Sequence, residues 1–233
     1  MSLPLPWDQF DAYLFDIDGT LLHCSDAVHY FAFCDALSSL AGRDLNLDGV
    51  TSHGNTDVGI LRDAFTRAGV AECLWRPKLA SLRDRMCAYV EGHRDEICPN
   101  VLPCVREMLT LLQDRGALLT VATGNLERIG KQKLTAAGLL HLFEMGAWSD
   151  RWERRADVFR HGIEDIRRSL GSHASILAIG DTPADITAAQ ENGIPVIAVA
   201  TGIYSMDELA LAKPSLCVPS LADLLLSASV AKL

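Results

Sequence analysis

The most constraining feature of this chain is a short apolar run that ends in two acids. Residues 12–15 are apolar, and the run Asp16-Ile17-Asp18-Gly19-Thr20 follows directly. An apolar run of this kind predicts a buried strand. Two carboxylates at the end of a buried strand need a cation, hydrogen-bond donors or water, because an unpaired charge away from water is costly. Taken alone, the pattern also fits a strand that simply stops in an Asp18-Gly19 turn.

Strands and helices alternate through most of the chain that follows. Apolar runs at 118–122, 176–179 and 195–199 predict buried strands, and weaker runs lie at 143–148 and 216–218. Near-continuous apolar strands that alternate with helices indicate a parallel sheet covered on both faces. The predicted fold class is therefore α/β, with a Rossmann-like three-layer core. Helices are expected at 103–115, 126–137, 156–170, 182–192 and 221–227.

Residues 21–97 differ from the rest, because they contain helical patterns and little that resembles a buried strand. We therefore predict an all-helical cap domain at 21–97, inserted into a core domain made of 1–20 and 98–233. Residues 99–103, with a proline at each end, are expected to form the linker that returns to the core. Within the insert the helical patterns cover 27–41, 56–68 and 79–91.

Composition narrows the possible partners and the compartment. The net charge is -9, which argues against nucleic acid or an anionic membrane surface as the main partner. No apolar run reaches the length of a membrane span, and the N-terminus does not resemble a secretory signal. The seven cysteines are odd in number and include no C-x-x-C pair, so we expect reduced thiols and a cytoplasmic protein.

Three of the predicted strands carry polar groups at their carboxyl ends. Asp16 and Asp18 follow the first strand, Thr123-Gly124-Asn125 follows the second, and Asp181 with Asp185 follows the strand at 176–179. Ligands of open parallel sheets bind outside the carboxyl ends of the strands. We therefore expect these groups to meet at one edge of the sheet, although they are far apart in sequence.

Several carboxylates at one edge indicate a hard cation. Carboxylates placed together raise each other's pKa unless a cation intervenes, and oxygen ligands without imidazole or thiolate suit Mg2+. Such an edge is suited to phosphate chemistry, because one carboxylate can attack phosphorus and a second can transfer a proton. The helix after Thr123 offers amide groups and a positive dipole end to a phosphate.

These motifs together resemble the haloacid dehalogenase (HAD) superfamily, in its phosphoglycolate phosphatase-like branch. The run Asp16–Thr20, Thr123 and the run Gly180–Asp185 resemble motifs I, II and IV, and the helical insert resembles the cap of that branch. The turn at 53–57 resembles the cap turn of the same branch. The resemblance covers essentially the whole chain and implies an Mg2+-dependent phosphatase that acts on a small phosphorylated metabolite through an aspartyl-phosphate.

The resemblance also implies roles for individual residues. Asp16 would be the nucleophile and a metal ligand, and Asp18 the general acid/base, with its backbone carbonyl also reaching the metal. Asp181 and Asp185 would hold or support the metal. An acid at position 18 distinguishes a phosphatase from the dehalogenase branch, which lacks it. The phosphoryl oxygens would be bound by Thr123, Gly124, Asn125 and one basic residue.

That basic residue is where the sequence departs from the family. The family usually has a lysine between motifs II and IV, but residues 148–160 contain none. Arg155, just before a predicted helix, is the best match, and Arg154 and Arg151 are its rivals. Lys131 and Lys133, on the helix after motif II, are expected at the surface.

Other interpretations remain open from the sequence. Asp185 fits a capping box with Thr182, Thr123 and Asn125 could cap a helix, and Asp57 could be an acid of a helix first turn. His23 and His53 are expected to be structural or exposed.

Two alternative functions also remain: a phosphomutase of the β-phosphoglucomutase type, which Thr20 argues against, and a non-catalytic protein that binds a phosphorylated ligand or a protein partner.

Overall fold

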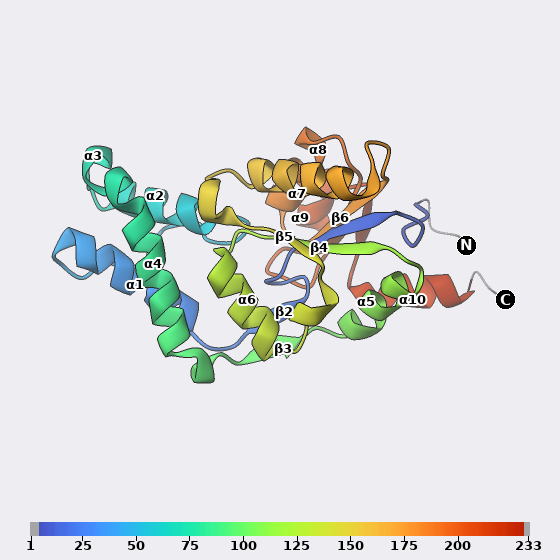
Figure 1. Cartoon of the computed structure of the whole chain (residues 1–233), viewed down its shortest axis with the longest axis horizontal. Helices are drawn as coiled ribbons and strands as arrows, with labels where there is room; N and C mark the ends of the chain where they lie inside the picture. The colour runs from blue at the N-terminus through green and yellow to red at the C-terminus, as the bar shows by residue number, and fades with distance from the viewer. Residues whose placement is uncertain (1–4, 231–233) are drawn as a thin grey trace.

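The computed structural model describes residues 5–230, and a six-stranded parallel sheet forms its centre (Figure 1). The strand order is β5-β4-β1-β6-β7-β8, which places β1 between the two other strands that were expected to carry site residues. Both neighbours pair with β1 in parallel, and Phe15 lies opposite Val121 of β4 and Ile179 of β6. The carboxyl ends of these three strands therefore lie at one level of the sheet. The strands are β1 Ala12–Phe15, β4 Leu118–Ala122, β5 Met145–Ala147, β6 Ile176–Gly180, β7 Val196–Val199 and β8 Leu216–Val218.

Helices cover both faces of this sheet (Figure 1). On one face, residues of α5, α6 and α10 pack against Tyr13 and Phe15 of β1 in one apolar cluster. On the other face, residues of α7, α8 and α9 pack against Leu14 and Ala178. Burial of alternate residues on opposite faces makes every position of β1 apolar and buried, as its sequence predicted. The helices are α5 Val105–Asp114, α6 Glu127–Ala136, α7 Arg155–Leu170, α8 Pro183–Glu191, α9 Met206–Leu211 and α10 Leu221–Val230.

The remaining helices form a separate unit beside the sheet (Figure 1). This unit has its own apolar cluster, in which Phe65 stacks on Trp75 with ring centroids 5.8 Å apart. Leu126 and Ile129, at the start of α6, belong to the same cluster, so the helical unit shares part of its core with the sheet domain. Its helices are α1 Val28–Ala41, α2 Asp57–Arg67, α3 Glu72–Trp75 and α4 Leu79–Gly92.

Two short strands join the helical unit to the sheet domain. The strands β2 (Leu22–Cys24) and β3 (Pro99–Val101) pair antiparallel, so the two crossings of the chain form a small ribbon. The sequence predicted neither strand: residues 22–24 were expected in the helical insert and 99–103 as a plain linker. Three residues are too few to show the alternation by which a strand is recognised.

The α/β fold with a parallel sheet and helices on both faces is confirmed, and all seven cysteines are free thiols. Within residues 5–230, no helix has both the length and the apolar character that crossing a membrane requires.

Candidate active site

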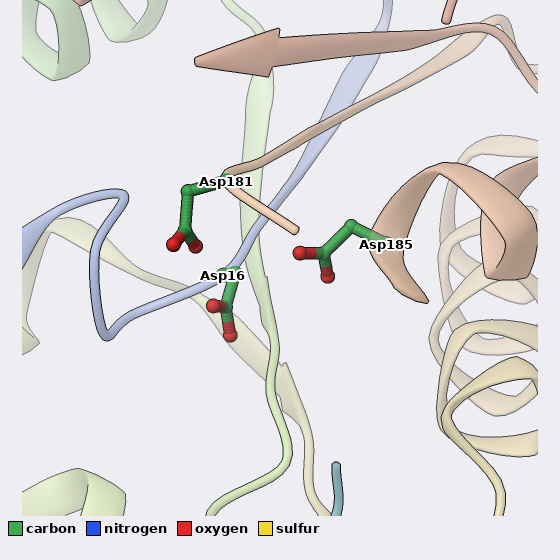
Figure 2. Close-up of side chains that lie close together, drawn as sticks. All are labelled: Asp16, Asp181 and Asp185. Carbon is green, nitrogen blue, oxygen red and sulfur yellow. The ribbon is translucent and has the colours of Figure 1, made fainter. Parts of the chain in front are cut away.

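Three buried carboxylates meet at the carboxyl edge of the sheet. Asp16 follows β1, Asp181 follows β6, and Asp185 lies in the first turn of α8. One carboxylate oxygen from each lies within 4.8 Å of the others, and the three side chains point toward one another (Figure 2). The structure thus brings together three of the acids that the sequence predicted at one edge.

Local sequence fixes the positions of these acids. Asp185 forms the predicted capping box, because its backbone N–H and carboxylate both bond to Thr182. Its other oxygen faces the centre of the site, so capping and a role in the site coexist in one side chain. Asp181 accepts a hydrogen bond from Thr20 Oγ1 at 3.1 Å. Gly19 has a φ of 85°, and a Cβ there would lie 2.2 Å from Asp181 Oδ2, so the turn after Asp18 requires glycine.

Arg155 lies among these acids at the start of α7. Its Nη2 lies 2.6 Å from Asp16 Oδ1 and its Nε lies 2.7 Å from Asp185 Oδ1. The two rivals lie elsewhere, since Arg154 pairs with Glu191 on the surface and Arg151 is exposed. Of the three arginines that the sequence left as candidates, the structure therefore places only Arg155 in the site.

Burial and mutual repulsion shift the pKa values of two acids upward. Burial is the main reason that the pKa of Asp16 is raised to about 6, and repulsion from Asp185 and Asp18 adds to it. Together these effects outweigh the attraction of Arg155, which lowers the pKa. Burial, together with Asp16 and Asp185, raises the pKa of Asp181 to about 9. One guanidinium therefore does not neutralise three carboxylates, and the site has the excess of hard oxygen donors that a divalent cation such as Mg2+ requires.

The Asp18 carboxylate lies outside this group of three and has a different partner. Lys133 Nζ lies 2.8 and 2.9 Å from its two oxygens, and Asn125 Nδ2 donates to it at 2.8 Å. Burial works to raise the pKa of Asp18, but Lys133 and Asn125 hold it below its ordinary value. Lys133 is only 6% exposed, so the expectation that it lies at the surface was wrong. Lys131, by contrast, is exposed and pairs with Glu127.

The loop at 123–125 lines the site as the sequence predicted, but part of the adjoining helix end is already occupied. The amides of Leu126 and Glu127 donate to the carboxylates of Asp57 and Asp150, each at 2.8 Å. Within the described residues, the Gly124 N–H has no acceptor. The Thr123 N–H donates to Ala147 O at 3.2 Å and the Asn125 N–H donates to Thr123 Oγ1 at 3.3 Å, so within the described residues the Gly124 amide is the one of the loop 123–125 that is open to a ligand. Thr123 and Asn125 do not serve as the N-cap of the helix, which is Leu126.

The helical unit closes over this loop through the turn at 53–57. The backbone N–H of Asp57 donates to Gly124 O at 2.7 Å, and Thr56 Oγ1 donates to Glu153 O at 2.8 Å. A Cβ on Gly124 would lie 2.1 Å from Asn55 O, so this close approach requires glycine. Asp57 thus lies in the first turn of α2, as predicted by the interpretation of this residue as a first-turn acid. Its carboxylate also links α2 to the N-terminal start of α6.

Two histidines were considered from the sequence, and a third was missed. His23 lies on the ribbon, with Nε2 2.8 Å from Thr201 O, and His53 is exposed at the mouth of the site. His29, on α1, lines the site, lies 3.2 Å from Asp57 Oδ2 and stacks on Phe33. Its position depends on how α1 docks against the sheet domain, and no sequence motif marks it.

A cavity of about 260 Å³ lies between the sheet edge and the helical unit. Its floor contains Asp16, Asp18, Asp181 and Arg155, and the 123–125 loop lines one side. This volume is below the range of pockets that hold drug-sized molecules, so it fits a small ligand.

Comparisons with known proteins agree with this geometry. The family model described as haloacid dehalogenase-like hydrolase matches residues 13–199. The protein named Probable phosphatase IndB from Dickeya dadantii is 27% identical over 216 residues, which cover 90% of each chain. A phosphoglycolate phosphatase from Mesorhizobium japonicum is 29% identical over 194 residues, 81% of this chain and 82% of that protein. The fold is similar to the crystal structure of a predicted phosphatase from Clostridium acetobutylicum, with a TM-score of 0.69, 22% identity and coverage of 96% and 99%.

Proposed function

Since the chain belongs to the haloacid dehalogenase-like hydrolase family and is a phosphatase of that type, we propose that it hydrolyses a small phosphomonoester with Mg2+ through an aspartyl-phosphate. The names of its relatives make phosphoglycolate one candidate substrate, and sugar phosphates are another. The observation that carries the proposal is the meeting of Asp16, Asp181, Asp185 and Arg155 beside a second acid, Asp18, in one small cavity.

The three clustered carboxylates fit the proposed Mg2+ site. Asp16, Asp181 and Asp185 supply or support hard oxygen ligands, and the backbone carbonyl of Asp18 adds another. When bound, the ion neutralises charge on the phosphoryl oxygens and lets the Asp16 carboxylate approach them. The raised pKa values of Asp16 and Asp181 support this assignment, because a cation would relieve the repulsion that raises them.

In the first step an Asp16 oxygen attacks phosphorus, and the bond between phosphorus and the ester oxygen breaks. The leaving oxygen takes a proton from Asp18 and departs as an alcohol. Arg155 holds Asp16 through Oδ1 and so fixes the direction of the carboxylate. In the free enzyme Lys133 favours the deprotonated form of Asp18, and the negative charge of an arriving phosphate favours its protonation.

In the second step water attacks phosphorus and gives a proton to Asp18. The bond between phosphorus and Asp16 then breaks, which restores the Asp16 carboxylate and releases inorganic phosphate. Thr123, with the amides of Gly124 and Asn125, binds the phosphoryl oxygens in both steps, and Arg155 balances their charge. The Asn125 side chain is already bonded to Asp18 and Lys133, so its contribution to phosphate binding is its backbone amide, which exchanges its bond to Thr123 Oγ1 for a phosphoryl oxygen.

Residues 21–97 act as the cap domain over the core of 1–20 and 98–233. The cap contacts the loop at 123–125 through the Asp57 N–H and contacts Glu153 O, just before α7, through Thr56 Oγ1. The first contact lies where water must be kept from the reacting atoms. Cap opening would break these contacts, the ion pairs of Glu153 with Arg62 and Arg76 and of Arg128 with Glu91, and the shared packing of Leu126 and Ile129. Substrate entry and product release then depend on this motion.

The proposal is tested with the full chain and a panel of phosphomonoesters, with MgCl2 or with EDTA. Released inorganic phosphate and the organic product are both measured. We expect free phosphate with Mg2+ and none with EDTA. An isomerised sugar phosphate in place of free phosphate would identify a mutase. No turnover of any ester, with retained binding of phosphorylated ligands, would identify a non-catalytic protein.

A further inference from the structure

The cap contributes a group of apolar side chains to the cavity, next to a polar segment at 52–57. Tyr30 and Phe33 of α1, Leu47 and Ile60 all line the cavity. The imidazole of His29 stacks on Phe33, with ring centroids 5.0 Å apart, and extends this apolar surface. We refer to these five residues as the cap wall. In a phosphatase of this geometry the cap wall faces the alcohol part of the ester, because the phosphoryl group lies at the sheet edge.

The lysine and arginine side chains in the cavity lining are already paired and do not await a second anionic group on the substrate. Within residues 5–230, its lining contains two side chains of the lysine and arginine type, Lys133 and Arg155, and both are paired with site carboxylates. Arg62, an arginine of the cap, lines a neighbouring hollow instead and pairs with Asp63 and Glu153. An anionic leaving group would therefore find no unpaired guanidinium or ammonium here.

The charged cap residue in the lining has the opposite sign. Asp57 is buried, and its Oδ2 is shared by the Leu126 amide and His29. The Asn55 side chain offers little more, because its amide is already bonded to Thr51 O, Asp63 and the Thr56 N–H. A substrate carboxylate against the cap wall would be desolvated without a lysine or arginine as its partner and placed near the Asp57 carboxylate, which is unfavourable.

We propose that the alcohol released by this enzyme is small and uncharged and presents an apolar face to the cap wall, so that the phosphoryl group carries the substrate's negative charge. This inference rests on the proposed phosphatase function. The cavity volume of about 260 Å³, shared with the phosphoryl group, limits the alcohol to a small one. Phosphate esters of small uncharged alcohols are then substrates, and phosphoglycolate, whose leaving group carries a carboxylate, is a poor one.

A matched pair of esters tests the charge alone. Phosphoglycolate and the phosphate ester of glycolamide have the same number of heavy atoms and differ in a carboxylate against a carboxamide. p-Nitrophenyl phosphate serves as the reference for phosphatase activity. We expect kcat/KM for the glycolamide ester to exceed that for phosphoglycolate by about 100-fold or more, because the buried carboxylate has no partner.

A charged cap wall should reverse the preference. Leu47 is partly exposed, so Leu47→Lys can place an ammonium at the cavity with little strain, and Leu47→Met is the uncharged control. We expect Leu47→Lys to lower the preference about 10-fold or more by raising kcat/KM for phosphoglycolate, and Leu47→Met to keep the wild-type preference. His53→Gln removes the imidazole at the mouth and should also keep the preference.

The outcomes separate the inference from the proposed function. Equal or better turnover of phosphoglycolate by the wild type would overturn the inference and leave the phosphatase function intact. Turnover of p-nitrophenyl phosphate alone would overturn it as well, because a small uncharged ester must be accepted. No turnover of these three esters or of any ester in the wider panel would overturn the phosphatase function itself.

Discussion

The two sides of the cavity are built on different physical principles. The sheet edge is charged, buried and densely bonded: Asp16 and Asp185 pair with the Arg155 guanidinium beside Asp181, and Asp18 is held by Lys133. The cap wall is mainly apolar, and its charged neighbour, Asp57, accepts a hydrogen bond from the N-terminal start of α6. The sheet edge therefore has the groups that change bonds, and the cap wall has a surface that selects by size and charge.

The largest expected effect tests the charged side alone. Asp16→Asn keeps the shape of the side chain and removes the nucleophile, so we expect kcat to fall by several orders of magnitude on every ester. The neutral amide also removes one of three repelling charges, so the thermal midpoint should not fall. Activity at the wild-type level in this variant would refute the covalent route, and a collapsed thermal midpoint would show that the loss is structural.

Arg155 provides the next test, because it connects the chemistry of the edge to its stability. Arg155→Met leaves Asp16 and Asp185 without their cation, and breaking a buried pair of this kind costs about 3–5 kcal/mol in the free energy of unfolding. We expect a loss of about 100-fold or more in kcat/KM. Urea unfolding and steady-state kinetics measure the two effects.

The matched control for Arg155 is its neighbour. Arg154 pairs with Glu191 at the surface, and its side chain is 60% exposed. Arg154→Ala should change kinetics little and cost less than about 1 kcal/mol. If Arg154→Ala lost activity while Arg155→Met kept it, the role of the basic residue would move to position 154.

Lys133 allows a test within the charged side, because it pairs with Asp18 and not with the three clustered carboxylates of Asp16, Asp181 and Asp185. Lys133→Met removes the partner of both Asp18 oxygens and of Asn125 Oδ1. We expect kcat to fall about 10- to 100-fold, with a smaller loss of stability than for Arg155, because Asp18 is partly open to water. Lys131→Met, on the exposed face of the same helix, is the control and should be close to wild type.

The sequence predicted the charged side far better than the cap wall, for a physical reason. Parallel strands end at one edge, so the positions of Asp16, Thr123 and Asp181 follow from the order of elements alone. Arg155 was predicted as the best of three arginines because it lies just before a predicted helix, although Arg154 lies only one residue earlier. The actual difference lies in the first turn of α7, where position 155 faces inward and position 154 faces solvent.

Lys133 and His29 were missed because their roles depend on helix rotation and docking. A signal for Lys133 was present: it follows Ile129 by four residues and precedes Leu134, so it lies on the buried face of α6. The positive charge of Lys133 was the reason to expect this side chain at the protein surface. For His29 no comparable signal exists, because its partners Asp57 and Phe33 come together only when α1 and α2 pack.

The smallest expected effect tests whether the charged side needs a cation to be stable. In the ion-free protein the pKa values of Asp16 and Asp181 are raised from 3.8 to about 6 and about 9. The folded state thus binds protons that the unfolded chain releases, so the free energy of unfolding should fall as pH rises through this window, by at most about 1.4 kcal/mol per pH unit for each proton bound. Thermal midpoints in EDTA should accordingly drop by several degrees between pH 6 and pH 8.5.

Mg2+ should oppose this loss, because a cation replaces the protons. We expect a larger rise of the thermal midpoint on adding MgCl2 at pH 8.5 than at pH 6, and Asp181→Asn should reduce both the pH dependence and the effect of the ion. The cap wall has no carboxylate cluster, so Leu47→Met should leave both unchanged. If Mg2+ stabilised the protein equally at both pH values, Asp16 and Asp181 would already be deprotonated at pH 6, and Arg155 would neutralise the site more fully than the geometry indicates.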